Sequence, residues 1–129
     1  DLKIEIMKTI DKVFDRMLDN KETRKNNIED ILNYIDRNCY KDISLDQVGE
    51  YANMSSYYLS KIFKKETGQS FVSYLTDYRM DRAEEMVLNT DEKSYKIAEK
   101  VGYQDANYFS YVFKKKFGVS PSKYRASGK

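Results

Sequence analysis

The feature that most constrains this chain is an internal repeat with a spacing of about fifty residues. The residues shared at that spacing are Tyr58, Ser60, Phe63, Lys64, Lys65, Gly68 and Ser70 in the first copy, and Tyr108, Ser110, Phe113, Lys114, Lys115, Gly118 and Ser120 in the second. Upstream of each turn the spacing is 49, so the second turn holds one extra residue. Each copy predicts a short helix, a tight turn and a longer helix, which is the order of elements in a helix-turn-helix.

Local signals predict where these helices begin and end. Glycine and proline are scarce, which favours helices along the whole chain. Ser44 with Gln47 forms a capping box ahead of a helix over 45–51, and Asn53 suits a left-handed residue in the turn after it. Further helix N-caps are predicted at Ser55, Ser70, Ser94 and Asp105, and Ser120 with Pro121 marks the start of a last short helix.

These elements predict an all-α fold. Its two helix-turn-helix subdomains lie at about 44–67 and 94–117, and a connecting helix at about 71–89 joins them. A helix of that size spans roughly 27 Å at 1.5 Å per residue. Successive major-groove entries on one face of B-DNA lie about 34 Å apart. One connecting helix is therefore the right size to hold two DNA readers near that spacing.

The first 25 residues form a separate segment with seven basic and six acidic side chains around an apolar stripe. The polar stretch 19–26 predicts a joint after this N-terminal helix, with Asn26 or Asn27 capping the next helix. We expect a connector at 1–25, the main domain at 26–125 and a tail at 126–129. A lone amphipathic helix cannot bury its stripe, so it must pack on this domain, on a second copy or on another domain. The start at Asp1 predicts a fragment whose sensor or receiver domain lies elsewhere in a longer protein.

The composition argues against an enzyme and against a membrane protein. Histidine is absent and Cys39 is the only cysteine, which excludes histidine-based acid–base catalysis, histidine metal sites and an internal disulfide. No glycine-rich phosphate loop or paired-carboxylate motif occurs, so we expect no cofactor and no metal. No apolar run is long enough to span a membrane and no signal peptide is visible. A single thiol, which we expect to be packed, suits the reducing cytoplasm.

The distribution of charge matters more than the net charge of +2. Residues 55–65 contain three lysines and no acidic residue, and residues 105–116 contain three lysines and one aspartate. Opposite the apolar stripe of each of these helices lies a hydrogen-bonding, aromatic and cationic face, whose members are Tyr57, Ser60, Lys61 and Lys64, or Asn107, Ser110, Tyr111 and Lys114. A merely solvated face would mix glutamate with lysine, so the pattern favours contact with DNA. The alternatives are two hairpins that only pack on each other, or a helical protein-interaction module that docks on RNA polymerase.

At these residues the chain resembles a known family. The segments Tyr57–Gly68 and Tyr108–Arg125 are similar to the AraC/XylS family of transcription regulators, over about residues 27 to 125. The resemblance implies that two helix-turn-helix units read successive major grooves of double-stranded DNA, with RNA polymerase as a further partner. A homodimer through residues 1–25 or through another domain is a further expectation.

The resemblance also implies which residues touch DNA. The expected base readers are Tyr57, Ser60, Lys61, Ala106, Asn107, Ser110 and Tyr111. The expected contacts to the DNA backbone are Ser55, Ser56, Lys64, Lys65, Tyr108, Lys114 and Lys115. Each has a structural alternative: the tyrosines could be surface aromatics, Asn107 could only help to cap its helix, and the lysines could be solvated.

Two residues depart from the family pattern. Tyr111 stands where the family often has arginine, and tyrosine reads guanine less decisively than a bidentate arginine. Gly49 stands where the family often has alanine, which predicts a cost of about 1 kcal/mol in helix propensity. Outside the pattern, Arg79 and Arg82 lie among acidic residues of the connecting helix, which predicts ion pairs.

Overall fold

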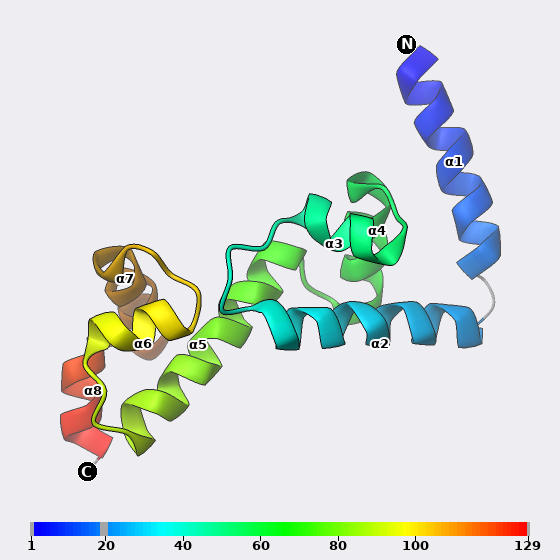
Figure 1. Ribbon diagram of the computed structural model, residues 1–129. Coiled ribbons are helices and arrows are strands. Elements are labelled where there is room, and N and C mark those ends of the chain that lie inside the picture. The colour runs from blue at the N-terminus through cyan, green and yellow to red at the C-terminus, as the bar shows by residue number, and fades with distance from the viewer. Residues whose placement is uncertain (1, 19–20, 129) are drawn as a thin grey trace. The chain divides into compact units, whose positions relative to one another are not determined.

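The computed structural model describes the backbone of residues 2–18 and 21–128, and the side chains of 2–10, 12–13 and 28–128 (Figure 1). The described residues form helices and no strand, which confirms the all-α class. The helices are α1 (Leu2–Leu18), α2 (Lys21–Asn38), α3 (Leu45–Ala52), α4 (Ser56–Thr67), α5 (Phe71–Asn89), α6 (Ser94–Lys100), α7 (Ala106–Phe117) and α8 (Pro121–Gly128). None of the described helices is long and apolar enough to cross a membrane.

The chain forms two compact units, and neither is continuous in sequence. The first comprises residues 1–36 and 44–71, and the second comprises residues 37–43 and 72–129. The seven-residue segment 37–43 therefore belongs to the second unit, although the first helix-turn-helix follows it directly. Each helix-turn-helix, α3 with α4 and α6 with α7, lies within one unit.

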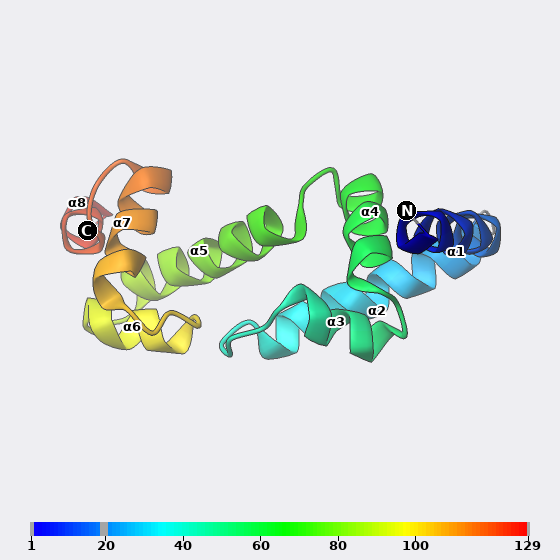
Figure 2. The same cartoon turned by 90° about the horizontal axis from the view of Figure 1, so that it is seen from above.

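Each unit has its own buried apolar residues. In the first unit these lie on α2, α3 and α4, with Phe63 packing edge-on against Phe71 at 5.8 Å between ring centroids. In the second unit α5, α6 and α7 share one core, which contains Met80, Ala83, Val87, Ile97, Ala98, Val101, Phe109 and Phe113. Figure 1 and Figure 2 both show α7 beside α6 and α8.

Two predicted helix boundaries are wrong. The helix expected to start near Ile28 begins at Lys21, so Asn26 and Asn27 lie inside α2 and do not cap it. Lysine, glutamate and arginine are good helix formers, and a lack of apolar residues did not break the helix over 21–26. Residues 19 and 20 of the expected joint lie outside the described residues. At the other end, α8 runs to Gly128 through most of the expected tail.

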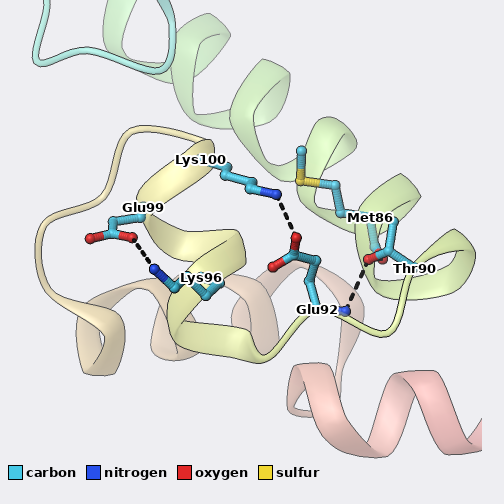
Figure 3. A network of polar contacts seen from close by, with 6 residues as sticks. All are labelled: Met86, Thr90, Glu92, Lys96, Glu99 and Lys100. Atoms are coloured by element: carbon cyan, nitrogen blue, oxygen red, sulfur yellow. Dashed lines mark hydrogen bonds and ion pairs between the residues drawn. The ribbon is translucent and has the colours of Figure 1, made fainter.

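The second error concerns the start of α6. Ser94 is the first helical residue, and the N-cap is Lys93, which makes no side-chain capping hydrogen bond. The predicted caps at Ser44, Ser55 and Asp105 are confirmed, including the reciprocal capping box of Ser44 with Gln47. The loop before α6 is held instead by polar contacts (Figure 3).

That loop joins α5 to α6 through residues 90–93. The Lys100 ammonium donates to Glu92 Oε1 at 2.5 Å, and the Glu92 N–H donates to Thr90 Oγ1 at 3.3 Å. The hydrogen bond from Lys100 holds the pKa of Glu92 below its ordinary value. A second ion pair, Lys96 with Glu99 at 3.6 Å, lies within α6. Side chains of α6 and of the loop therefore hold this loop, and the start of α6 has no side-chain cap.

Gly49 has a structural reason that helix propensity does not capture. A Cβ added at this buried position would lie 2.6 Å from the carbonyl oxygen of Met54. The Met54 N–H in turn donates to the Gly49 carbonyl at 2.8 Å, and Asn53 between them adopts a left-handed φ of 56°. The first turn packs directly on α3, so glycine permits the close approach.

Candidate nucleic-acid interface

The second helices of the two helix-turn-helix pairs, α4 and α7, are built alike. Each has 12 residues and a polar side chain at its N-cap. Ser55 Oγ accepts from the Tyr58 N–H at 3.1 Å, and Asp105 Oδ1 accepts from the N–H groups of Asn107 and Tyr108 at 2.9 and 3.3 Å. Each helix ends on a left-handed glycine, Gly68 or Gly118. Residues fifty apart thus hold the same position counted from the cap.

One face of each helix is buried. Leu59 and Phe63 of α4 and Phe109 and Phe113 of α7 have no exposed surface. The expected base readers Tyr57, Ser60 and Lys61, and Asn107 and Tyr111, all lie exposed at the spacing i, i+3, i+4. Since residues three and four apart share a helix face, the structure brings each set of readers together on one exposed face of its helix.

Two of the expected base readers are less exposed to solvent. Ser110 is half-buried. Ala106 is partly buried and packs against the core of the second unit. On α4 the Lys61 ammonium lies 4.8 Å from the centroid of the Tyr57 ring, a cation–π contact that joins two of the expected readers.

The expected backbone contacts fall into two groups. Lys64, Lys65, Lys114 and Lys115 are exposed in the last turns of α4 and α7. At the start of α4, Ser55 is exposed, but the Ser56 hydroxyl donates to Asp46 of α3. The Asp46 carboxylate therefore lies beside the N-terminus of α4, where sequence reasoning placed only hydroxyl groups.

Lys116 is a cation that does not belong to this face. Its ammonium lies 2.9 Å from Asp81 Oδ1 and 3.5 Å from Asp77 Oδ1, both on α5. Partial burial lowers the pKa of Lys116, but the hydrogen bond and the two carboxylate charges outweigh burial and raise it. Of the three lysines that end α7, two therefore remain on the candidate interface.

One pair of repeated tyrosines differs in burial. Tyr58 is 2% exposed, whereas its counterpart Tyr108 is 56% exposed. The Tyr108 ring stacks on Tyr111 with centroids 6.4 Å apart and lies 6.0 Å from Tyr103. Tyr103 belongs to the second turn, which holds the extra residue. The longer turn was visible in the sequence, but its effect on Tyr108 depends on packing.

Arg79 on α5 fastens the segment 37–43 within the second unit. Its Nε donates to the Cys39 carbonyl at 3.0 Å and its Nη2 to the Lys41 carbonyl at 2.7 Å. The guanidinium also lies 5.4 Å from the centroid of the Tyr103 ring. Where the sequence suggested acidic partners for Arg79, the structure shows backbone carbonyls beyond the end of α2.

Cys39 and Arg82 complete this junction. The Cys39 thiol is fully buried, as predicted for a packed cysteine, and its Sγ accepts from Arg82 Nη1 at 3.1 Å. At the far end of α5, Arg125 of α8 donates to the Val87 carbonyl at 2.8 Å, and the Tyr124 hydroxyl donates to Glu84 Oε2 at 2.6 Å. That hydrogen bond raises the pKa of Tyr124. The middle and the C-terminal part of α5 thus contact other elements of the second unit.

This architecture defines a tandem helix-turn-helix protein. A family model described as a helix-turn-helix domain matches residues 48–127. The multiple antibiotic resistance protein MarA of Escherichia coli (strain K12) is 33% identical over 98 residues, which cover 76% of this chain and 77% of MarA. The C-terminal domain of the response regulator yesN from Fusobacterium nucleatum is 40% identical with a TM-score of 0.76, covering 78% of this chain and 98% of that domain.

The chain therefore belongs to the AraC/XylS family of transcription regulators. Some relatives are much longer. Regulatory protein PocR of Salmonella typhimurium is 35% identical over 94 residues, which cover 73% of this chain but 31% of PocR. The chain thus spans about a third of the length of that relative.

Proposed function

We propose that the chain binds double-stranded DNA in a sequence-specific manner and thereby regulates transcription. The observation that carries the proposal is the equivalence of α4 and α7. Each has a polar cap, a fully buried leucine or phenylalanine stripe, and an exposed polar and aromatic face that ends in lysines. Two such faces suit two major grooves, because each groove admits one α-helix. Membership in a family of transcription regulators supports the same function.

Within this proposal the residues divide into two roles. Tyr57, Ser60, Lys61, Asn107, Ser110 and Tyr111 contact base edges, with Ala106 at the margin. Ser55, Ser56, Lys64, Lys65, Tyr108, Lys114 and Lys115 contact phosphates and sugars. RNA polymerase is a further proposed partner. The proposed location is the cytoplasm.

Replacing one residue of each role separates the roles. We expect Lys61→Ala to alter sequence preference at one base pair, at a cost of about 1–3 kcal/mol in binding free energy. Lys115→Ala should weaken all sequences alike and reduce the slope of log affinity against log salt by about 0.9, the value for one phosphate contact. The measurement is a fluorescence titration of specific and scrambled duplexes at several salt concentrations.

Identical behaviour of the two variants would contradict the division of roles. A helical protein-interaction module without DNA reading is the alternative function. It predicts that the unaltered chain binds duplexes with no preference between specific and scrambled sequences.

The N-terminal helix supports a proposed homodimer. Leu2, Ile4, Ile6, Ile10 and Val13 are exposed on α1, with Leu2 at 73% and Val13 at 53%. A cluster of exposed aliphatic side chains on one helix favours association. We expect sedimentation of the chain to show a dimer, and removal of residues 1–18 to leave a monomer. Sedimentation as a monomer both with and without residues 1–18 would count against the dimer.

A further inference from the structure

We propose that the two recognition helices read different base pairs. On this proposal α4 selects a half-site with a G·C pair through Lys61, and α7 selects an A·T half-site through Asn107 and Tyr111. The inference rests on the proposed DNA binding and adds the base composition of the two half-sites. It predicts an asymmetric operator for a protein whose sequence contains a repeat.

The comparison between the helices is direct because their geometry matches. Counted from the caps Ser55 and Asp105, the second helical position holds Tyr57 in α4 and Asn107 in α7. The sixth position holds Lys61 in α4 and Tyr111 in α7. The fifth position holds serine in both. Among these three positions, a difference in base reading must therefore come from the chemistry of the second and sixth.

On α4 the sixth position is a cation. The Lys61 ammonium only donates hydrogen bonds, and its contact with the Tyr57 ring holds it on the exposed face of α4. Guanine presents two acceptors, O6 and N7, to the major groove, whereas adenine presents one acceptor and one donor. An ammonium group therefore favours guanine over adenine at this position.

On α7 the second position carries an amide whose side chain is not used by the fold. The Asp105 carboxylate caps α7 and accepts from the Asn107 backbone N–H. Asn107 is exposed, and its side-chain amide makes no hydrogen bond to any described residue. An amide offers one donor and one acceptor in a plane, which matches N6 and N7 of adenine. The observed capping leaves Asn107 available for that contact.

The sixth position of α7 is an aromatic ring. Tyr111 is 62% exposed and is stacked on the exposed Tyr108 with an interplanar angle of 26°. Among the base-reading positions of α7 there is no lysine or arginine, and Lys116 is held by α5. An exposed apolar ring in the major groove suits the methyl group of thymine. On α4 the counterpart of Tyr108 is buried, so this stacked pair belongs to α7 alone of the two helices.

The first experiment is selection from random duplexes with the complete 129-residue chain and with Lys61→Ala and Asn107→Ala. We expect the unaltered chain to select two motifs. Lys61→Ala should lose discrimination at a G·C pair in one motif, and Asn107→Ala at an A·T pair in the other, each by on the order of 10- to 100-fold. Both side chains are exposed, so neither replacement should unfold the protein, and circular dichroism checks this.

The second experiment tests the methyl contact alone. Deoxyuridine replaces thymidine in the motif altered by Asn107→Ala, which removes the methyl group and keeps the base pair. The affinity of the unaltered chain and of Tyr111→Phe should fall about fourfold, the effect of one buried methyl group. The affinity of Tyr111→Ser should not change on the same replacement.

Two results would overturn the inference and leave DNA binding intact. One is a G·C pair at the position altered by Asn107→Ala. The other is equal affinity of the unaltered chain for thymidine and deoxyuridine duplexes throughout that motif. If the unaltered chain selects no motif at all, the proposed function itself is overturned, and the inference with it.

Discussion

Replacing Gly102 with alanine is expected to lower the free energy of unfolding by about 2–4 kcal/mol. Gly102 lies in the turn between α6 and α7 with a φ of 100°, a region that L side chains rarely adopt. A Cβ there would also lie 2.4 Å from the Cys39 carbonyl oxygen and 3.0 Å from two nitrogens of Arg79. The backbone strain and the steric clash add. Chemical denaturation followed by circular dichroism measures the change.

Gly118→Ala is the matched control for that experiment. Gly118 also has a positive φ, 87°, but an added Cβ there would have no atom within 4 Å. It should therefore show the cost of backbone strain alone, about 1 kcal/mol. Equal losses for the two variants would show that the contact with Cys39 and Arg79 contributes nothing.

The second large effect concerns DNA. We expect simultaneous replacement of Tyr57, Lys61, Asn107 and Tyr111 by alanine to weaken specific binding at least about 1,000-fold. Each base contact is worth about 1–3 kcal/mol, and contacts on separate helices add approximately. All four side chains are exposed, so stability should change little. Fluorescence anisotropy with the selected duplex measures the affinity.

Replacing residues of the same kinds elsewhere provides the control. Asn89, Lys93 and Tyr95 are exposed around the junction of α5 and α6 and belong to neither α4 nor α7. Their replacement by alanine should leave affinity for the selected duplex unchanged. Unaltered DNA binding in the four-residue variant would contradict the whole set of proposed base readers.

Sequence patterns were sufficient where structure is decided within a few residues. The caps at Ser44, Ser55 and Asp105 and the left-handed Asn53 are local hydrogen-bond and backbone preferences, and the structure confirms them. The two recognition helices followed from the repeat and from the spacing of their apolar residues. Their exposed faces followed as well, because the buried stripe determines the opposite side of a helix.

Sequence patterns were insufficient for contacts between segments that lie far apart in the sequence. No local pattern indicates that Arg79 binds carbonyls some forty residues earlier in the chain, or that Lys116 pairs with carboxylates of α5. The different exposures of Tyr58 and Tyr108 also depend on neighbours from other elements. At Gly49 the sequence showed a poor helix former, whereas the structure shows a backbone approach that a Cβ would block.

The assignment of segment 37–43 to the second unit makes that unit a discontinuous domain. The first helix-turn-helix is an insertion between two parts of it, and Arg79 closes the junction with hydrogen bonds to Cys39 and Lys41. A fragment that begins at residue 72 would therefore lack the partners of Arg79, and the surface that Cys39 covers would be exposed in it. The two readers are repeated in sequence, yet they are not interchangeable modules, and a chimera should carry residues 37–43 together with the second reader.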